Sequence, residues 1–179
     1  MGRDVSELFT FDEFLTHWAS ERPHRVGLRE EGRVYSYAEL DDRTARAASA
    51  LIAAGLKKGD RIAWIGKNSD LYFTLFYGAA RAGIVMAPIG WRLSPTEWAF
   101  IVNDTQAKIV FAGPGFDGLA GQLAGKLDND PAIIGAADAW AMIDDADRVS
   151  FEPSGANDAV LQLYTSGTTG NPKGAVLSN

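Results

Sequence analysis

Apolar residues recur along the chain in two patterns, a helical period and short continuous runs. Phe11, Phe14, Leu15 and Trp18 stand at i, i+3, i+4 and i+7, which places them on one face of a helix. The short runs have the length of buried strands and are bounded by turn residues. We therefore predict helices at 11–20, 37–54, 70–82, 95–103 and 119–127, and strands at 26–29, 33–35, 61–65, 84–89, 108–112 and 132–134.

Three of these helices begin with the same arrangement of residues. A hydroxyl residue is followed three positions later by glutamate, with an apolar residue on either side of the group. In such a capping box the hydroxyl accepts a hydrogen bond from the backbone of the glutamate, and the glutamate carboxylate accepts one in return. The pairs are Thr10 with Glu13, Ser36 with Glu39, and Ser94 with Glu97.

Strand and helix alternate from residue 61 onward, after a leading helix and a predicted hairpin that turns at Gly32. This alternation is typical of an α/β fold in which helices pack on a mostly parallel sheet, with right-handed crossovers. We divide the chain into a leading helix and strand (1–32), an alternating α/β part (33–112), a variable connector (113–158), and a final segment of strand, loop and strand (159–179).

The final segment contains the run Tyr-Thr-Ser-Gly-Thr-Thr-Gly-Asn-Pro-Lys-Gly at 164–174, between apolar runs at 159–163 and 175–177. Its glycines let backbone N–H groups approach an anion, and its hydroxyls and Lys173 add further donors. The spacing differs from that of the P-loop of NTPases. These residues indicate a phosphate-binding loop, although composition alone leaves open a solvated turn with a surface lysine.

Composition and charge narrow the class of protein. The chain has no cysteine, which excludes disulfides and thiolate metal sites, and its formal net charge of -6 argues against a nucleic-acid surface. There is no apolar run of about 20 residues and no apolar signal region, so we expect no transmembrane segment and a cytoplasmic location. His17 and His24 do not suggest a metal site.

The run at 164–174 resembles the phosphate-binding signature of the adenylate-forming superfamily, which includes acyl-CoA synthetases, luciferases and the adenylation domains of peptide synthetases. The resemblance implies that the loop holds the β- and γ-phosphates of MgATP while a carboxylate attacks the α-phosphate, and that a thiol then takes the acyl group. It implies a catalytic role for Lys173 and no metal ligand in this chain. By position, the nucleotide contacts are Thr165, Ser166, Gly167, Thr168, Thr169, Gly170, Lys173 and Gly174.

The resemblance covers nearly the whole chain at lower specificity. It includes 35–40, 81–88 and 91–97, where helix caps and sheet core are the stronger interpretation. Lys67, Asn68 and Ser69 follow a predicted strand and could line a ligand crevice, although a turn that begins a helix explains them equally well.

Enzymes of this superfamily are much longer, and their other signatures lie downstream of the segment matched here. We therefore expect an N-terminal portion of an AMP-forming acid–CoA ligase that uses ATP, Mg²⁺ and CoA, with a fatty acid as the favoured substrate. We expect the portion alone to be inactive and its partner to be the missing C-terminal portion, with a homo-oligomer as a further possibility. The alternatives are an adenylation enzyme that loads a carrier protein, and a non-catalytic α/β module that binds anions or a partner.

Overall fold

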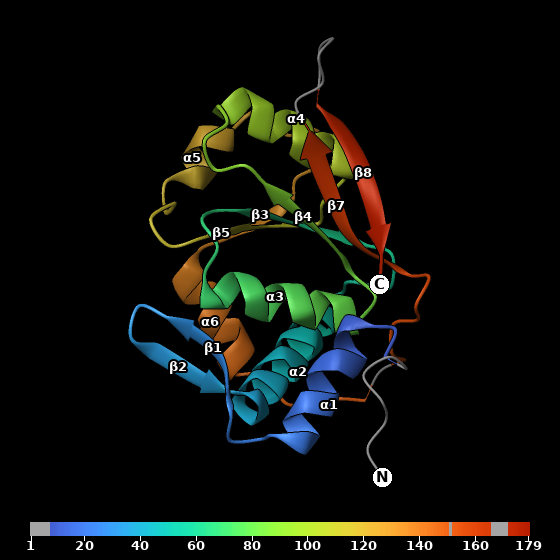
Figure 1. Ribbon diagram of the computed structural model, residues 1–179. Helices are drawn as coiled ribbons and strands as arrows, with labels where there is room; N and C mark the ends of the chain where they lie inside the picture. Colours follow the sequence, from blue (N-terminus) through green and yellow to red (C-terminus); the bar gives the residue numbers. More distant parts are fainter. Residues whose placement is uncertain (1–7, 151, 166–171) are drawn as a thin grey trace.

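The computed structural model describes residues 8–150, 152–165 and 172–179 of the chain (Figure 1). Helices and strands alternate through most of its length, as the hydrophobic pattern predicts. In chain order the elements are α1 (Phe11–Glu21), β1 (Val26–Glu30), β2 (Arg33–Ser36), α2 (Tyr37–Ala53), β3 (Arg61–Ile65), α3 (Asp70–Arg81), β4 (Val85–Ile89), α4 (Pro95–Thr105), β5 (Ile109–Ala112), α5 (Leu119–Leu123), β6 (Ala132–Ile134), α6 (Ala136–Asp144), β7 (Ala159–Thr165) and β8 (Lys173–Ser178).

Six strands form one sheet in the order β6-β5-β3-β4-β7-β8. The first five run parallel to their neighbours, and β8 pairs antiparallel with β7 at one edge. Strands β1 and β2 form a separate antiparallel hairpin, as expected from the turn at Gly32. The predicted α/β fold with a mostly parallel sheet is confirmed.

Helices cover both faces of the sheet (Figure 1). On one face α2, α3 and α6 pack against the strands, and α1 lies beside α2 and α3. On the other face α4 and α5 cover the sheet. The pleat of β3 shows the division, because Ile62 and Trp64 belong to the first core and Ala63 and Ile65 to the second.

The capping residues form the helix starts that the sequence predicts, with one difference. At Ser94 the side-chain oxygen accepts a hydrogen bond from the backbone N–H of Glu97 at 3.3 Å, and the Glu97 carboxylate accepts one from the backbone of Ser94 at 2.8 Å. Ser36 and Glu39 form the same reciprocal pair. At the first helix Thr10 accepts from the backbone of Glu13, but the carboxylate of Glu13 accepts from the backbone N–H of Phe9.

Two details between residues 113 and 158 differ from the prediction. The helix expected at 119–127 ends at Leu123, because Ala124 is extended and Gly125 adopts a left-handed φ of 68°. Helix α6 was not predicted; its Ala139 and Ile143, one turn apart, are fully buried in the core beneath the sheet. The expected strand at 132–134 is present as β6.

Candidate phosphate-binding site

The hairpin of β7 and β8 carries the candidate site at the end where Thr165 and Lys173 are paired (Figure 1). Its antiparallel register pairs Thr165 with Lys173 and Tyr164 with Gly174, so the two strands lead directly into and out of the predicted loop. The strands expected on either side of the predicted loop are therefore present. Of the predicted contacts, Ser166, Gly167, Thr168, Thr169 and Gly170 lie outside the described residues.

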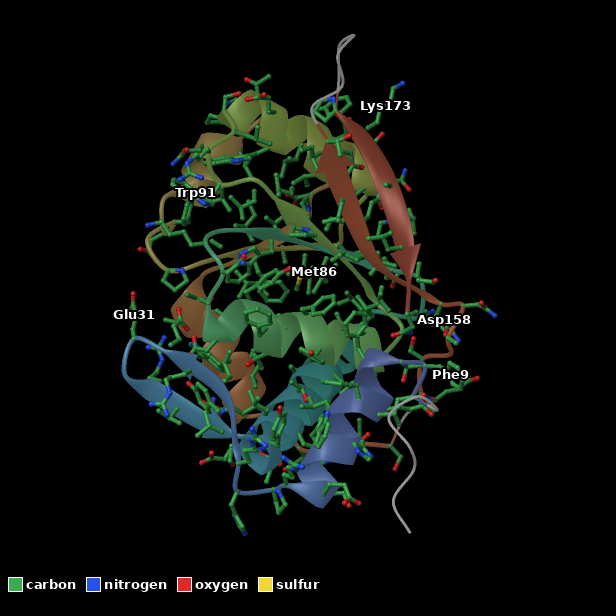
Figure 2. All side chains as sticks on the ribbon, in the orientation of Figure 1. Phe9, Glu31, Met86, Trp91, Asp158 and Lys173 are labelled. Atoms are coloured by element: carbon green, nitrogen blue, oxygen red, sulfur yellow. The ribbon has the colours of Figure 1, made fainter. Side chains whose placement is uncertain are left out.

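Lys173 and Thr165 are exposed residues on opposite sides of the loop's base. Figure 2 shows the Lys173 side chain at the tip of the hairpin, directed away from the sheet. Among the described residues no carboxylate forms an ion pair with it. Its ammonium group is therefore available to an anion held by the loop.

Two side chains lie against the backbone of Gly174. A Cβ atom at this position would lie 2.8 Å from Nε2 of Gln162 and 2.9 Å from Cζ of Tyr164. Tyr164 is the cross-strand partner of Gly174, so its ring covers the neighbouring strand where that strand leaves the loop. Gly174, a predicted nucleotide contact, is thus packed against Tyr164, which is not among the predicted contacts.

A continuous chain of hydrogen bonds runs beneath the hairpin. Nε of Arg61 donates to Oε1 of Gln162 at 2.8 Å, and Nε2 of Gln162 donates to the Tyr164 hydroxyl at 2.8 Å. The Tyr164 hydroxyl in turn donates to a carboxylate oxygen of Asp104. Burial, together with the Asp104 carboxylate, raises the pKa of Tyr164 above its usual value, so the hydroxyl stays protonated and remains a donor.

A second group of polar side chains lies at the carboxyl ends of β3 and β4, where the strand order of the sheet reverses. The strand order places β3 between β4 and β5, and the helices that follow β3 and β4 pack on opposite faces. At such a point the two connections diverge, and ligands of open α/β sheets bind in the crevice between them. The connections here are residues 66–69 and 90–94.

These two connections bring two cations to one aromatic ring. Nζ of Lys67 lies 5.3 Å from the ring centroid of Trp91, and Cζ of Arg92 lies 4.0 Å from it. Figure 2 shows Trp91 at the surface beside the start of α4. Ser69 is instead buried and caps α3 by accepting a hydrogen bond from the backbone of Tyr72 at 3.1 Å. The helix-start interpretation therefore fits Ser69, and the crevice interpretation of Lys67 stays a prediction.

The described part of the chain offers no group of three or more His, Cys, Asp or Glu residues arranged to hold a metal ion. The Mg²⁺ that the resemblance implies belongs with bound ATP, and no ligand for it is assigned to these residues. None of the described helices has the length and apolar character needed to cross a membrane.

Comparison with known proteins places the chain in a family. The family model described as AMP-binding enzyme matches residues 15–179, and the chain belongs to this family. A fatty acid–acyl-carrier-protein ligase, ScoC, from Streptomyces coeruleorubidus is 34% identical over 179 residues, which cover 97% of this chain and 34% of that protein. The long-chain-fatty-acid–CoA ligase FadD13 of Mycobacterium tuberculosis is 38% identical over 153 residues, which cover 79% of this chain and 29% of that protein.

Solved structures agree with the fold. The N-terminal domain of FACL13 from Mycobacterium tuberculosis superimposes with a TM-score of 0.84 at 31% identity, over 96% of this chain and 44% of that one. The chain spans 34% of ScoC and 29% of FadD13, about a third of the length of these curated relatives.

Proposed function

We propose that this chain is the N-terminal part of an AMP-forming acid–CoA ligase. The observation that carries the proposal is the exposed Lys173 ammonium opposite Thr165, unpaired among the described carboxylates, at the base of the predicted phosphate-binding loop in a chain of the AMP-binding family. A fatty acid is the favoured substrate, because two of the similar proteins are named for ligases of fatty acids.

The proposed reaction has two steps. A carboxylate oxygen of the acid attacks the α-phosphorus of MgATP, the bond from that phosphorus to the bridging oxygen breaks, and pyrophosphate leaves. The thiol sulfur of CoA then attacks the acyl carbonyl, AMP leaves, and the thiol proton passes to solvent or a base. The hairpin loop holds the β- and γ-phosphates in the first step, and Lys173 stabilises the charge that develops on the departing pyrophosphate.

We expect the 179-residue chain alone to give no ATP–pyrophosphate exchange. The loop holds only the leaving end of ATP, whereas the reaction needs the adenine, the metal and the carboxylate aligned in one site. Exchange is measured with labelled pyrophosphate and a panel of carboxylic acids, first on the chain alone and then with the remaining portion supplied. Exchange by the chain alone would contradict the proposal, as would its absence from the complete enzyme with every acid.

The cations at Trp91 support CoA as the acceptor. CoA carries several phosphates, and Lys67 and Arg92, held beside the half-buried Trp91, offer positive charge to them. Lys67, Trp91 and Arg92 follow β3 and β4, where the strand order reverses. This is the position at which ligands of open α/β sheets bind.

Replacing Arg92 by alanine is expected to raise KM for CoA roughly 10-fold, as for the loss of one charge-assisted contact. Pyrophosphate exchange, which needs no CoA, should stay within about twofold of the unaltered enzyme. Arg22→Ala is the matched control, because Arg22 also lies over a tryptophan ring, at 5.2 Å from Trp18. Equal increases in KM for CoA and for ATP would contradict a role of Arg92 in binding CoA.

The similarity to ScoC favours one alternative, an enzyme that transfers the acyl group to a carrier protein. Both reactions share the adenylation step and differ only in the thiol. Offering CoA and a phosphopantetheinylated carrier protein to the same enzyme, with one acid, separates the two by the product formed. The non-catalytic alternative predicts neither product and no pyrophosphate exchange.

A further inference from the structure

Few backbone hydrogen bonds to the rest of the sheet hold the end of β7 that leads into the loop. Its parallel ladder with β4 has one register pair, Met86 with Leu161, and from there β7 continues toward the loop with β8 as its ladder partner. The other end of the hairpin is held by side chains, since Asp158 forms an ion pair with Lys58 at 2.7 Å and Asn179 accepts from the backbone of Phe11 at 3.1 Å. The end beside the loop needs its own attachment.

Tyr164 supplies that attachment by reaching α4. Its ring packs against the core on the α4 face, and its hydroxyl donates to Asp104, 60 residues earlier in the chain. Helix α4 is itself fixed, because its Ile101 and Val102 are fully buried against the sheet. Tyr164, which immediately precedes Thr165, therefore connects the end of β7 to the last turn of α4.

The position of Asp104 is unfavourable for the helix alone. It lies in the last turn of α4, where the helix dipole presents its negative end and a carboxylate is destabilising. The hydrogen bond from Tyr164 gives this carboxylate a partner outside the helix. A residue that opposes the local preference of its helix, and whose side-chain partner among the described residues lies on the strand beneath the loop, is more readily explained by the strand than by the helix.

The Tyr164 hydroxyl is held from a second side as well. Gln162 donates to it, and the orientation of the Gln162 amide is fixed by Arg61 at the start of β3. Gln162 is only 7% exposed, and its bonds to Arg61 and Tyr164 are partly buried. The Tyr164 hydroxyl therefore accepts one hydrogen bond, from Gln162, and donates one, to Asp104. The ring cannot move away without breaking both bonds.

We propose that Tyr164 is a positioning residue for adenylation, acting through Asp104 to fix the direction in which β7 and β8 present Thr165 and Lys173 to the phosphates. The inference rests on the proposed function. Tyr164 is adjacent to Thr165 in sequence, and its cross-strand partner Gly174 is adjacent to Lys173, so a tilt of the ring moves both sides of the loop's base. A misplacement of about 1 Å can cost a reaction roughly 100-fold in rate.

Tyr164→Phe in the complete enzyme removes the hydroxyl and keeps the ring. We expect the rate constant for adenylation to fall roughly 10-fold, within the range known for displaced catalytic groups. Thioester formation from preformed acyl adenylate should stay within about twofold, because pyrophosphate has already left. Asp104→Asn keeps an acceptor oxygen and should retain more adenylation activity than Asp104→Ala. The double variant Tyr164→Phe, Asp104→Ala should be no slower than the slower single variant.

The matched control is Tyr35→Phe. The Tyr35 hydroxyl also donates to an aspartate, Asp70, at 2.7 Å, but it belongs to the β1–β2 hairpin. This variant should lose a comparable hydrogen bond and keep both half-reactions at normal rates.

Unfolding midpoints of all variants are measured in parallel, so that a general loss of stability is recognised. Adenylation at the normal rate in Tyr164→Phe, or equal slowing of both half-reactions, overturns the inference. If Tyr164→Phe does not fold, the comparison of Asp104→Asn with Asp104→Ala decides in the same way. Absence of pyrophosphate exchange from the unaltered enzyme would instead remove the proposed function, and this inference with it.

Discussion

Replacing Lys173 by alanine is expected to reduce the rate constant for adenylation by roughly 10- to 1,000-fold, as for the loss of one electrostatic stabiliser of a transition state. The ammonium of Lys173 is exposed, unpaired among the described side chains, and carried on a flexible stem at the base of the loop. It can therefore follow the β- and γ-phosphates as the bond to the α-phosphorus breaks. An interaction that strengthens in the transition state lowers the barrier more than it tightens ATP binding.

Single-turnover measurements of the two half-reactions test this expectation. Thioester formation from preformed acyl adenylate should change much less than adenylation, because pyrophosphate is absent from that step. Lys126→Ala is a suitable control, since Lys126 is also exposed but follows α5, in the connection to β6. If only the affinity for ATP fell, or if both steps slowed equally, Lys173 would be a ground-state or structural contact.

Replacing Arg81 by methionine is expected to destabilise the protein by about 3–5 kcal/mol, the cost of leaving buried charges without their partner. Arg81 is 6% exposed at the end of α3 and forms ion pairs with Asp12 of α1 at 2.8 Å and Asp41 of α2 at 2.9 Å. Its guanidinium also donates to the Thr44 hydroxyl at 2.9 Å. One side chain thus joins three helices beneath the sheet.

The loss should depend on pH in a defined direction. Burial raises the pKa of Asp12, and the charge of Arg81 partly opposes that rise. Without Arg81 the pKa of Asp12 rises further, so the ionised carboxylate destabilises the folded state at neutral pH. A carboxyl group whose folded pKa is raised contributes its full stability below its unfolded pKa and loses it as pH rises through the folded pKa. The deficit of Arg81→Met should therefore shrink as pH falls from about 7 toward 4.

Urea denaturation at several pH values measures this deficit. Lys108→Met is the control, because the half-exposed Lys108 forms an ion pair with Asp60 at 2.6 Å, away from this cluster. An exposed pair contributes about 0.2–1 kcal/mol. A deficit for Arg81→Met that is equally small, or that grows as pH falls, would contradict the role assigned to the buried cluster.

Much of the fold could be predicted because its signals are local. The starts of α1, α2 and α4 follow from a hydroxyl and a glutamate three residues apart, and β3 has the predicted bounds because Arg61–Ile65 is a short apolar run between turns. Helix α6 lacks such a signal. It follows Gly135 without a side-chain cap, and only two of its residues, Ala139 and Ile143, are buried. Tertiary packing under the sheet, and not a local pattern, defines it.

The candidate site divides in the same way. The location of the loop could be predicted because glycines, hydroxyls and a lysine are gathered in one short stretch, although Thr165 and Lys173, expected within it, are the last residue of β7 and the first of β8. The support beneath it could not, because Arg61 and Gln162 are 101 residues apart and Asp104 and Tyr164 are 60 apart. The one available signal was an aspartate directly after the predicted helix at 95–103, near the negative end of the helix dipole.

The place of β7 beside β4 also bears on how the molecule assembles. Met86 and Leu161 are farther apart along the chain than the paired residues of any other two neighbouring strands in the sheet. The entropy lost on closing a chain segment grows with its length, so this pairing is the costliest one to nucleate. The β7–β8 hairpin, in contrast, closes over a short loop and can form before it docks. The edge that would hold ATP is therefore the part of the sheet whose formation depends most on the other strands being already in place.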